Sequence, residues 1–382
     1  MIRILLRFFH RLFSNIVDFW PLPRQPSRVT LKQVLVVRMD HLGDFVIWLD
    51  AARKLRQLYP PDQWEITLLV ETSLVNYARQ YTYWDRVFGA SRWRIYNNPL
   101  ARFRLLLGIR KNAYDAVLVT SFSRSYYVED SIVRASRAPA RTGFDANLSN
   151  ISDEDKRQGD ALYTRLIDTP DEDTPEFFRN ALLLSDLGVP DWQPEPAHLK
   201  RDGHGTSIGP FDYVLLPGSG QAYRNWDKER FAELADMIFR KTGFKGVILG
   251  TSADNTLADW IKQHSRAPLV DLTGQTSINE LISIIGDARF VVGNESGGAH
   301  IAAAVATPSV TILGGGHFQR FMPYPESVLG AVVAKTVVHP MECFHCDWKC
   351  TLSTDASKPY PCIDGVSVAQ AWHQVQAVIR AL

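Results

Sequence analysis

The chain contains 382 residues, of which 46% are hydrophobic and 22% are charged, and its formal net charge is +1. This is the composition of a globular protein long enough for two domains, because domains typically contain about 100–200 residues. The balanced charge argues against nucleic acid as the main partner. The sequence also lacks an apolar run of the roughly 20 residues that a membrane-spanning helix requires.

Residues 1–20 predict an amphipathic helix with a basic face. Apolar side chains recur at three- and four-residue steps from Ile2 to Trp20, and arginines occupy the opposite face. Such a helix suits a membrane surface that carries anionic lipid, and its apolar face can equally pack on the chain itself or on a second subunit. The arginines interrupt any signal-peptide core, so we do not expect cleavage. A proline-rich spacer ends this segment, which we assign to residues 1–30.

The next region, residues 31–200, predicts a parallel α/β domain. A buried strand at 31–37 is followed by a Gly43-Asp44 turn, a helix over 45–58 and a strand at 65–70. Asp44 should therefore lie at the carboxyl edge of the sheet, beside a helix N-terminus, where open α/β folds bind ligands. Helix capping is the alternative role for this aspartate.

Basic side chains gather in two later stretches of the same region. The first holds Arg92, Arg94, Arg102, Arg104, Arg110 and Lys111, and the second holds Arg134, Arg137 and Arg141. Both could form a cationic face for an anionic substrate, although such a run is usually the solvated side of a helix. The sequence ARTGF at 140–144 predicts a turn, and the Pro- and Gly-rich stretch 191–210 predicts a linker.

A second α/β domain is predicted over residues 201–365, with an amphipathic helix at 366–382. A strand at 213–216 leads into a turn at 217–220, with Arg224 close behind, and Asp227 can cap the helix that follows. The stretch 289–316 reads as a strand, a glycine-rich turn, an alanine-rich helix and another strand. Backbone N–H groups of that turn, beside Glu295, Ser296 and His300, suit a nucleotide pyrophosphate and its ribose. The alternative is that the glycines only pack the helix tightly on the strand.

The segment 341–363 contains every cysteine of the chain, spaced C-x2-C-x3-C-x11-C. These residues are Cys343, Cys346, Cys350 and Cys362. Four thiolates at such spacing can form a tetrahedral zinc or iron site of structural kind. Two disulfides or free thiols are the alternatives, and His345 adds a further candidate ligand.

Four motifs occur in order across roughly residues 33–330, and together they resemble one family. The motifs are VVRMDHLGDFV, ARTGF, LLPGSGQAYRNWDKERFAELA and VVGNESGGAHIAAAVATPSVTILGG. The set resembles the ADP-heptose-type heptosyltransferases of glycosyltransferase family 9. The resemblance implies a GT-B fold, in which two Rossmann-like doubly wound domains face each other across a cleft. The donor would bind the C-terminal domain, the acceptor the N-terminal one, and the last helix would cross back to the first domain.

The resemblance also implies roles for individual residues. Asp44 matches the candidate general base of an inverting, metal-independent transfer that requires no cofactor. The remaining matches, assigned to the donor, are Gly43, Ser219, Gly220, Arg224, Glu295, Ser296, Gly297, Gly298 and His300. The chain departs from the family pattern in having Glu295-Ser296 in place of Asp-Thr, Arg224 in place of lysine, and Asp40-His41 before the Leu-Gly-Asp. These changes leave the donor sugar and the acceptor open.

We therefore expect a cytoplasmic glycosyltransferase that associates peripherally with the inner membrane. It would transfer heptose or a related sugar from ADP-heptose to lipopolysaccharide core or another surface glycan. On the ground of charge alone, the basic N-terminal helix and the arginines at 92–110 and 134–141 suit an anionic, lipid-linked acceptor, with Arg134, Arg137 and Arg141 as the acceptor-binding residues. The alternatives are a heptosyltransferase acting on an autotransporter protein and a catalytically silent nucleotide-sugar-binding subunit. A dinucleotide oxidoreductase is disfavoured, because no G-x-G-x-x-G follows the first strand.

Overall fold

A computed structural model describes residues 31–169, 173–201, 209–353 and 355–382. The chain forms two compact units. Of the described residues, the first unit contains those at 31–41, 51–169 and 179–192, and the second contains those at 42–50, 173–178 and from 193 to 382. The amphipathic helix predicted at 1–20 lies outside the described residues. Within those residues, no helix combines the length and the apolar character needed to cross a membrane.

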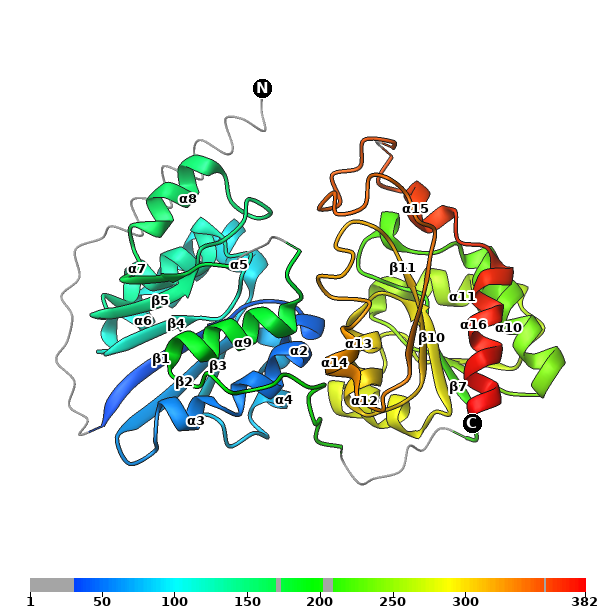
Figure 1. The fold of residues 1–382 in the computed structure, drawn as a ribbon, viewed down its shortest axis with the longest axis horizontal. Coiled ribbons are helices and arrows are strands. Elements are labelled where there is room, and N and C mark those ends of the chain that lie inside the picture. The colour runs from blue at the N-terminus through cyan, green and yellow to red at the C-terminus, as the bar shows by residue number, and fades with distance from the viewer. Residues whose placement is uncertain (1–30, 170–172, 202–208, 354) are drawn as a thin grey trace. The chain divides into compact units, whose positions relative to one another are not determined.

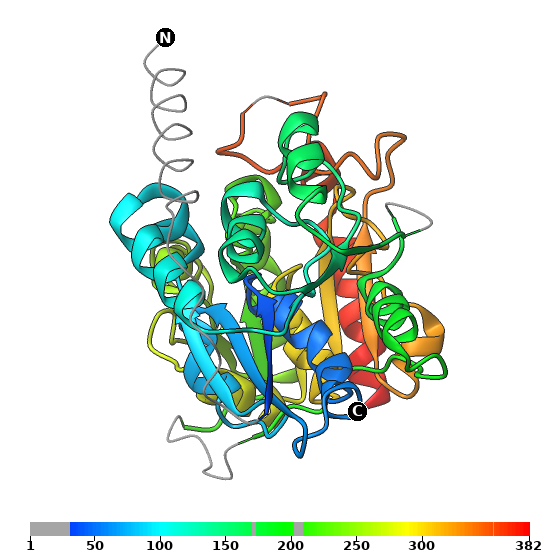
Figure 2. The same cartoon turned by 90° about the vertical axis from the view of Figure 1, so that its left-hand side faces the viewer.

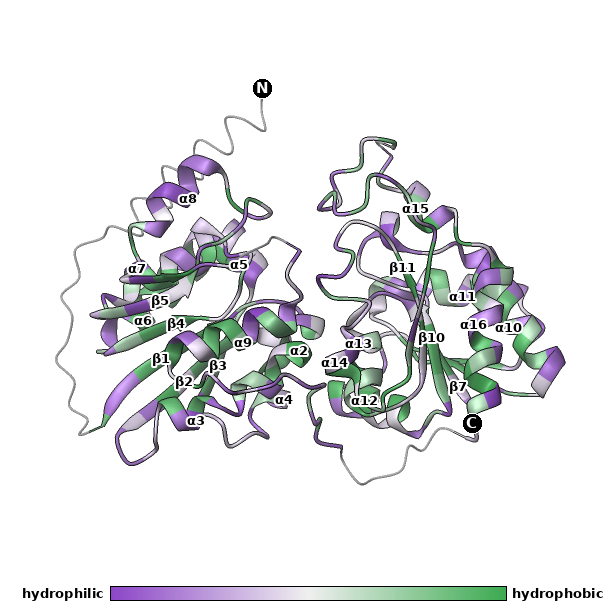
Figure 3. Ribbon diagram, in the orientation of Figure 1, coloured by the Kyte–Doolittle hydropathy of each residue, from purple (hydrophilic) through white to green (hydrophobic). Residues whose placement is uncertain are grey.

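The first unit contains a six-stranded parallel sheet in the order β3-β2-β1-β4-β5-β6. Its strands are β1 (Lys32–Arg38), β2 (Trp64–Glu71), β3 (Arg86–Ala90), β4 (Ala116–Val119), β5 (Ala140–Phe144) and β6 (Arg165–Ile167). The central strand β1 is apolar and buried from Val34 to Val37, as expected for a parallel strand covered on both faces. Figure 3 shows the apolar strands of both units.

The helices of this region connect consecutive strands. They are α2 (Leu42–Ala52), α3 (Leu55–Leu58), η1 (Thr72–Leu74), α4 (Val75–Ala78), α5 (Arg92–Asn97), α6 (Pro99–Lys111), the π-helix η2 (Tyr126–Asp130), α7 (Ser131–Ser136), α8 (Asp153–Asp160) and α9 (Glu176–Leu187). The single helix expected over 45–58 is interrupted at residues 53–54, which separate α2 from α3. The turn expected at 140–144 is wrong, because these residues pair with β4 and β6 as strand β5.

The second unit contains another six-stranded parallel sheet, in the order β12-β11-β10-β7-β8-β9. Its strands are β7 (Tyr213–Leu216), β8 (Gly246–Ile248), β9 (Leu269–Asp271), β10 (Phe290–Asn294), β11 (Ser309–Leu313) and β12 (Ala334–Val338). In each sheet the first and fourth strands of the unit are neighbours at the centre, which is the doubly wound order of dinucleotide-binding folds. Figure 2 shows the same chain from the side of the first unit.

The helices of the second unit pack on this sheet. They are η3 (Ala222–Arg224), α10 (Lys228–Thr242), η4 (Ser252–Asp254), α11 (Asn255–His264), α12 (Ile278–Asp287), α13 (Gly297–Ala304), α14 (Glu326–Leu329), α15 (Pro361–Asp364) and α16 (Val368–Ala381). The last helix α16 contacts α10, β10, β11 and β12, all in its own unit. The expectation that it crosses back to the first domain is therefore wrong. Its apolar side chains, among them Val375 and Val378, are buried in the core of the second unit.

The starts of two helices in the second unit differ in how they are capped. Asp227 precedes α10 as its N-cap residue, but its side chain makes no capping hydrogen bond. In contrast, Ser277 and Glu280 form a reciprocal capping box at the start of α12, which satisfies two backbone N–H groups. A Ser-x-x-Glu pattern therefore specifies a helix start here more reliably than an aspartate alone.

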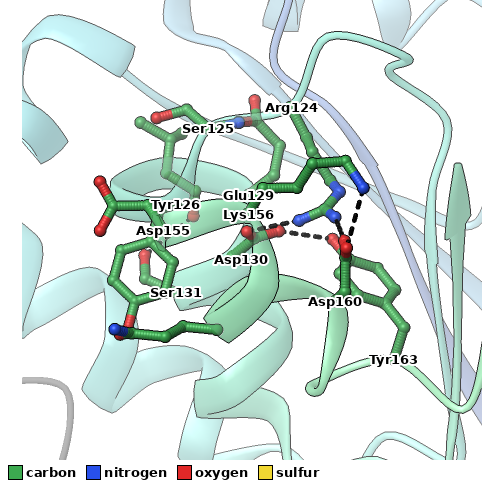
Figure 4. Close-up of polar contacts among 12 residues, drawn as sticks. Arg124, Ser125, Tyr126, Glu129, Asp130, Ser131, Asp155, Lys156, Asp160 and Tyr163 are labelled. Carbon is green, nitrogen blue, oxygen red and sulfur yellow. Dashed lines mark hydrogen bonds and ion pairs between the residues drawn. The ribbon is translucent and has the colours of Figure 1, made fainter. Parts of the chain in front are cut away.

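A buried ion network holds the carboxyl side of β4 in the first unit (Figure 4). The guanidinium of Arg124 pairs with Asp130 at 2.6 Å, and both side chains are 0% exposed. Arg124 also pairs with Asp160, while the hydroxyl of Tyr163 donates to Asp130 at 2.8 Å. Lys156, also in α8, bonds Asp160 at 2.9 Å and pairs with Asp145, which follows β5. These contacts tie the π-helix η2 to α8 and to the end of the sheet.

We predict that Asp130→Ala destabilises the first unit by about 3 kcal/mol or more. Removing one partner of a buried ion pair leaves the other charge uncompensated, which typically costs about 3–5 kcal/mol. Urea denaturation measures this change. Asp153→Ala, which removes an exposed carboxylate from the first turn of α8, is the matched control and should change stability by less than about 1 kcal/mol. Equal losses in the two variants would contradict the network's role.

Candidate functional site

The strongest candidate site lies where the strand order of the second sheet reverses. Strands β7 and β10 are parallel neighbours there, with Leu216 opposite Gly293. The turn after β7, residues 217–220, and the turn after β10, residues 295–296, therefore lie at the same edge of the sheet. In open α/β sheets this crevice, at the carboxyl ends of the strands, is where ligands bind.

Two asparagines that the sequence analysis did not single out fix the shape of this edge. Asn294 is 0% exposed, its amide donates to the carbonyl of Pro217 at 2.6 Å, and its oxygen accepts from the backbone N–H of Trp226 at 3.0 Å. The side-chain oxygen of Asn225 accepts from the backbone N–H of Ser219 at 2.8 Å and from its hydroxyl at 2.7 Å. The backbone of Gly220 has a φ of +78°, a conformation that side chains disfavour.

Arg224 brings positive charge to the same edge. One of its Nη atoms lies 3.1 Å from a carboxylate oxygen of Glu295, and its guanidinium carbon lies 4.8 Å from the ring centre of Trp348. Its Nε is buried and has no hydrogen-bond partner among the described residues. An oriented arginine with an unused donor is suited to a phosphate, which accepts several hydrogen bonds from such a fork.

The N-terminus of α13 adds backbone donors beside this arginine. Ser296 is the N-cap residue, and its side chain makes no capping hydrogen bond. Gly297 and Gly298 follow as the first residues of the helix, and the free N–H groups of a first turn carry partial positive charge. The structure therefore brings together the predicted residues of both turns, and together they can bind an anion such as a diphosphate.

His300 lies one turn further along α13 and is buried. Its Nδ1 is 2.6 Å from the hydroxyl of Tyr324, a partner that nothing in the local sequence indicates. Burial, together with the positive charge of Arg224, lowers the pKa of His300 to about 3. Burial likewise raises the pKa of Tyr324. His300 is therefore neutral at physiological pH, and Arg224 carries the positive charge of the predicted donor set.

Gly43 and the first turn of α2 lie against α13 within the second unit. A Cβ atom on Gly43 would be 2.9 Å from Cδ2 of His300, so only glycine allows this approach. Asp44 follows as an acidic residue of that first turn, and the N-cap position belongs to His41. Asp44 is thus not the N-cap residue, and its role as general base stays a prediction. Its carboxylate is partly exposed, close in sequence to the glycine that contacts the site.

The switch point of the first sheet holds a second polar cluster, after β1 and β4. The hydroxyl of Ser121 donates to Asp40 at 2.6 Å, and Arg38 lies 3.2 Å from the same carboxylate oxygen. Arg38 also donates to the carbonyl of Thr120 at 2.7 Å. Asp40, which departs from the family pattern, is thus held by its own unit's residues.

The arginines predicted to bind an acceptor lie elsewhere in the first unit. Arg141 is in the first half of β5, where its side chain donates to the carbonyl oxygens of Leu162 and Ala138. The guanidinium carbon of Arg134 lies 4.8 Å from the ring centre of Tyr126, and Arg137 ends α7 with a φ of +50°. Arg141 thus lies near the amino end of β5, whereas Arg134 lies against η2. Their acceptor role stays a prediction.

The four cysteines line one small cavity together with Gly315, Phe344 and Trp348. Burial raises the pKa of Cys346 and of Cys362, and the negative charge of the neighbouring thiolates adds to the effect. All four are free thiols. No group of three or more His, Cys, Asp or Glu side chains within the described ranges is arranged to hold a metal ion. The thiols are therefore gathered in one place without forming a preorganised site.

The neutral state of buried His300 predicts a specific loss of stability in acid. Its folded pKa of about 3 lies below the usual 6.5, so the unfolded chain binds the proton first as the pH falls through 6.5. Between about pH 7 and pH 5 the wild type should lose about 2 kcal/mol of unfolding free energy relative to His300→Asn, since one pH unit corresponds to about 1.4 kcal/mol. Urea denaturation at each pH measures this. His198→Asn, which removes a 79% exposed imidazole, is the control, and parallel curves for wild type and His300→Asn would contradict the prediction.

Comparison of the sequence with known proteins identifies a family. Residues 102–346 match the family described as glycosyltransferase family 9 (heptosyltransferase). Lipopolysaccharide heptosyltransferase 3 of Escherichia coli K12 is 26% identical over 163 residues, which are 40% of this chain and 47% of that relative. The chain thus spans about half the length of this curated relative.

Two solved structures share the fold at low identity. The Escherichia coli ADP-heptose lps heptosyltransferase II is 16% identical with a TM-score of 0.65, over 91% of this chain and 99% of that one. The iron-containing dodecameric glycosyltransferase TibC of enterotoxigenic Escherichia coli is 13% identical with a TM-score of 0.57, over 94% and 80% of the two chains. These likenesses confirm the expected GT-B fold class. Since the family match covers more than half of the sequence, this chain belongs to glycosyltransferase family 9.

Proposed function

We propose that this protein is an inverting, metal-independent glycosyltransferase that moves a heptose, or a related sugar, from ADP-heptose to lipopolysaccharide core or another surface glycan. Membership of the family supports the reaction class. The observation that carries the proposal is the arrangement of Arg224 and the α13 N-terminus on one edge of the second sheet, with an arginine Nε still available as a donor. That edge is suited to the diphosphate of a nucleotide sugar.

In the proposed reaction the acceptor hydroxyl attacks the anomeric carbon of the donor sugar, and the bond from that carbon to the diphosphate breaks. A direct displacement of this kind inverts the configuration at the carbon. Asp44 takes the proton from the attacking hydroxyl as general base. The negative charge that develops on the departing ADP is stabilised by Arg224 and by the backbone N–H groups of α13.

Two features of the site bear on how it would hold the donor. Since His300 stays neutral, the charge that balances the diphosphate comes from Arg224, whose planar fork differs from the ammonium of the lysine usual in the family. Glu295 pairs with Arg224 and so orients its guanidinium. The glutamate side chain is longer than that of the aspartate usual in the family, which suits the reach from the turn after β10 to Arg224. The ribose hydroxyls of the nucleotide would bind beside Glu295 and Ser296.

The proposal assigns different steps to Asp44 and Arg224, and this separation is testable. Asp44→Asn should lower kcat by about 10²–10⁴ and leave the donor Kd within about twofold, because general-base catalysis contributes about that much. Arg224→Ala should raise the donor Kd by about tenfold or more, since a charge-assisted pair to phosphate is lost. Calorimetry with ADP-heptose and a coupled assay of ADP release measure the two effects.

Asp62→Asn and Arg266→Ala, which change exposed side chains, are the matched controls for these variants. Donor binding by the wild type without turnover, and with no effect of Asp44→Asn, would contradict the enzyme proposal and favour a silent nucleotide-sugar-binding subunit. Tight binding of a UDP- or GDP-sugar instead of ADP-heptose would contradict the donor assignment.

A second candidate is transfer to a protein acceptor, which the cysteine cluster keeps open because a metal-stapled segment could dock a protein. The similar structure of TibC is that of an iron-containing glycosyltransferase, and this chain gathers four thiols in one cavity. We propose that these thiols hold a structural zinc or iron ion, outside the reaction. Ligation needs thiolates, so binding would release the protons that burial keeps on Cys346 and Cys362.

We predict about one zinc or iron per chain in the purified protein, measured by mass spectrometry of the metals. The double variant Cys343→Ser/Cys346→Ser should lose the metal, because a tetrahedral site with two ligands removed binds it poorly. His345→Asn is the control and should retain it if the ligands are the four thiolates. The proposal of a metal site would be contradicted if the purified wild type contained no metal and all four of its thiols reacted with a thiol reagent.

A further inference from the structure

We infer that α5 and α6 of the first unit form a docking surface for an anionic phospholipid bilayer. The surface, called here the α5–α6 patch, consists of Trp93, Arg94, Tyr96, Leu100 and Arg104. Its apolar members are unusually exposed for their size, at 70% for Trp93, 56% for Leu100 and 40% for Tyr96. A bilayer interface attracts this combination of aromatic rings and arginines.

The basic run from 92 to 111 divides into internal and external arginines. Arg92 pairs with the buried Glu129, Arg102 donates to the carbonyl of Tyr127, and Arg110 is 5% exposed. These three serve the unit's own core, which corrects the expectation that the whole run is a cationic face. Arg94 and Arg104 instead are exposed, and neither makes an ion pair with any residue that the structure describes.

The helical spacing explains why an apolar and a basic side chain point outward together. In α6, Leu100, Arg104, Gly108 and Lys111 recur at three- and four-residue steps and are all exposed, while Leu106 and others on the opposite side are buried. Ser91 and Asn98 cap α5 and α6 through hydrogen bonds to Arg94 and Ala101 backbone N–H groups. The exposed residues therefore sit on two defined helices.

Charge identifies the partner. The sequence contains no Asp or Glu between Arg86 and Tyr114, so the patch has no acidic side chain of its own segment beside it. A surface of phosphates would attract it, and long arginine side chains can reach phosphates while Trp93 and Leu100 enter the apolar boundary.

The position of the patch suits the proposed function, on which this further step rests. Helix α5 begins two residues after the carboxyl end of β3, and Tyr96 packs edge-on against Tyr127 of η2, with ring centres 5.9 Å apart. The patch thus adjoins the edge of the first sheet at which Asp40 and Ser121 lie. A lipid-linked acceptor held in the bilayer would then be presented to that edge.

The test is binding of the full chain to vesicles of phosphatidylcholine alone and of equal parts phosphatidylcholine and phosphatidylglycerol. We expect the anionic vesicles to slow amide hydrogen exchange in peptides covering 92–107. Arg94→Glu/Arg104→Glu should weaken binding to them by about tenfold or more, since each basic residue near such a surface contributes several-fold. Trp93→Ser/Leu100→Ser should weaken it as well. The controls Lys241→Glu/Lys262→Glu and Val270→Ser change equally exposed side chains of the second unit and should leave binding within about twofold.

Two results would overturn the inference. The first is vesicle binding that leaves exchange at 92–107 and the affinity of Arg94→Glu/Arg104→Glu unchanged, which would assign binding to another part of the chain. The second is that amide exchange at 92–107 is already slow in the absence of vesicles and that the mass measured by light scattering is lower for Arg94→Glu/Arg104→Glu than for the wild type. That result would make the patch a contact between copies of the chain.

Activity on two acceptors separates this inference from the proposed function. With a deacylated, soluble acceptor the patch variants should match the wild type, and with a vesicle-embedded acceptor their apparent KM should rise. Lack of transfer by the wild type to either acceptor would count against the proposed function, while the exchange and binding measurements would still decide the patch.

Discussion

The structure of the candidate site depends on one constraint, which is that β7 and β10 are direct neighbours in a parallel sheet. Their pairing places two chain-distant turns at one edge, and the buried amide of Asn294 locks them together through Pro217 and Trp226. A buried amide left without these partners would cost about 1–3 kcal/mol. The positions of Arg224 and of the α13 N-terminus follow from this pairing.

Few groups at that edge can supply positive charge to a bound anion, because burial keeps the imidazole of His300 neutral. Arg224 is paired with Glu295, so the donors that face an anion are the Nε of Arg224 and the N-terminus of α13. The first unit places its buried charges differently. There, Arg124 and Asp130 neutralise each other and hold η2 and α8 rather than a ligand.

Much of this fold could be predicted from the sequence, since buried parallel strands appear as short apolar runs. The predicted strand at 213–216 coincides with β7, and the second strand predicted within 289–316 is β11. The edge strands β6 and β12 are short or only partly buried and are not predicted, and β5 is predicted as a turn. Pairing with a neighbouring strand determines that those segments are strands, and this pairing cannot be read from the sequence of the segment itself. The same limit hid Tyr324 and Trp348, which reach the site from distant loops.

The central claim is that the second unit binds a nucleotide diphosphate at the β7–β10 edge, and a crystal structure of the protein with ADP tests it most directly. The account predicts the diphosphate against the N-terminus of α13, within hydrogen-bond distance of Arg224 Nε, and next to the 219–220 turn. ADP bound at another edge, or absent at saturating concentration, would contradict it.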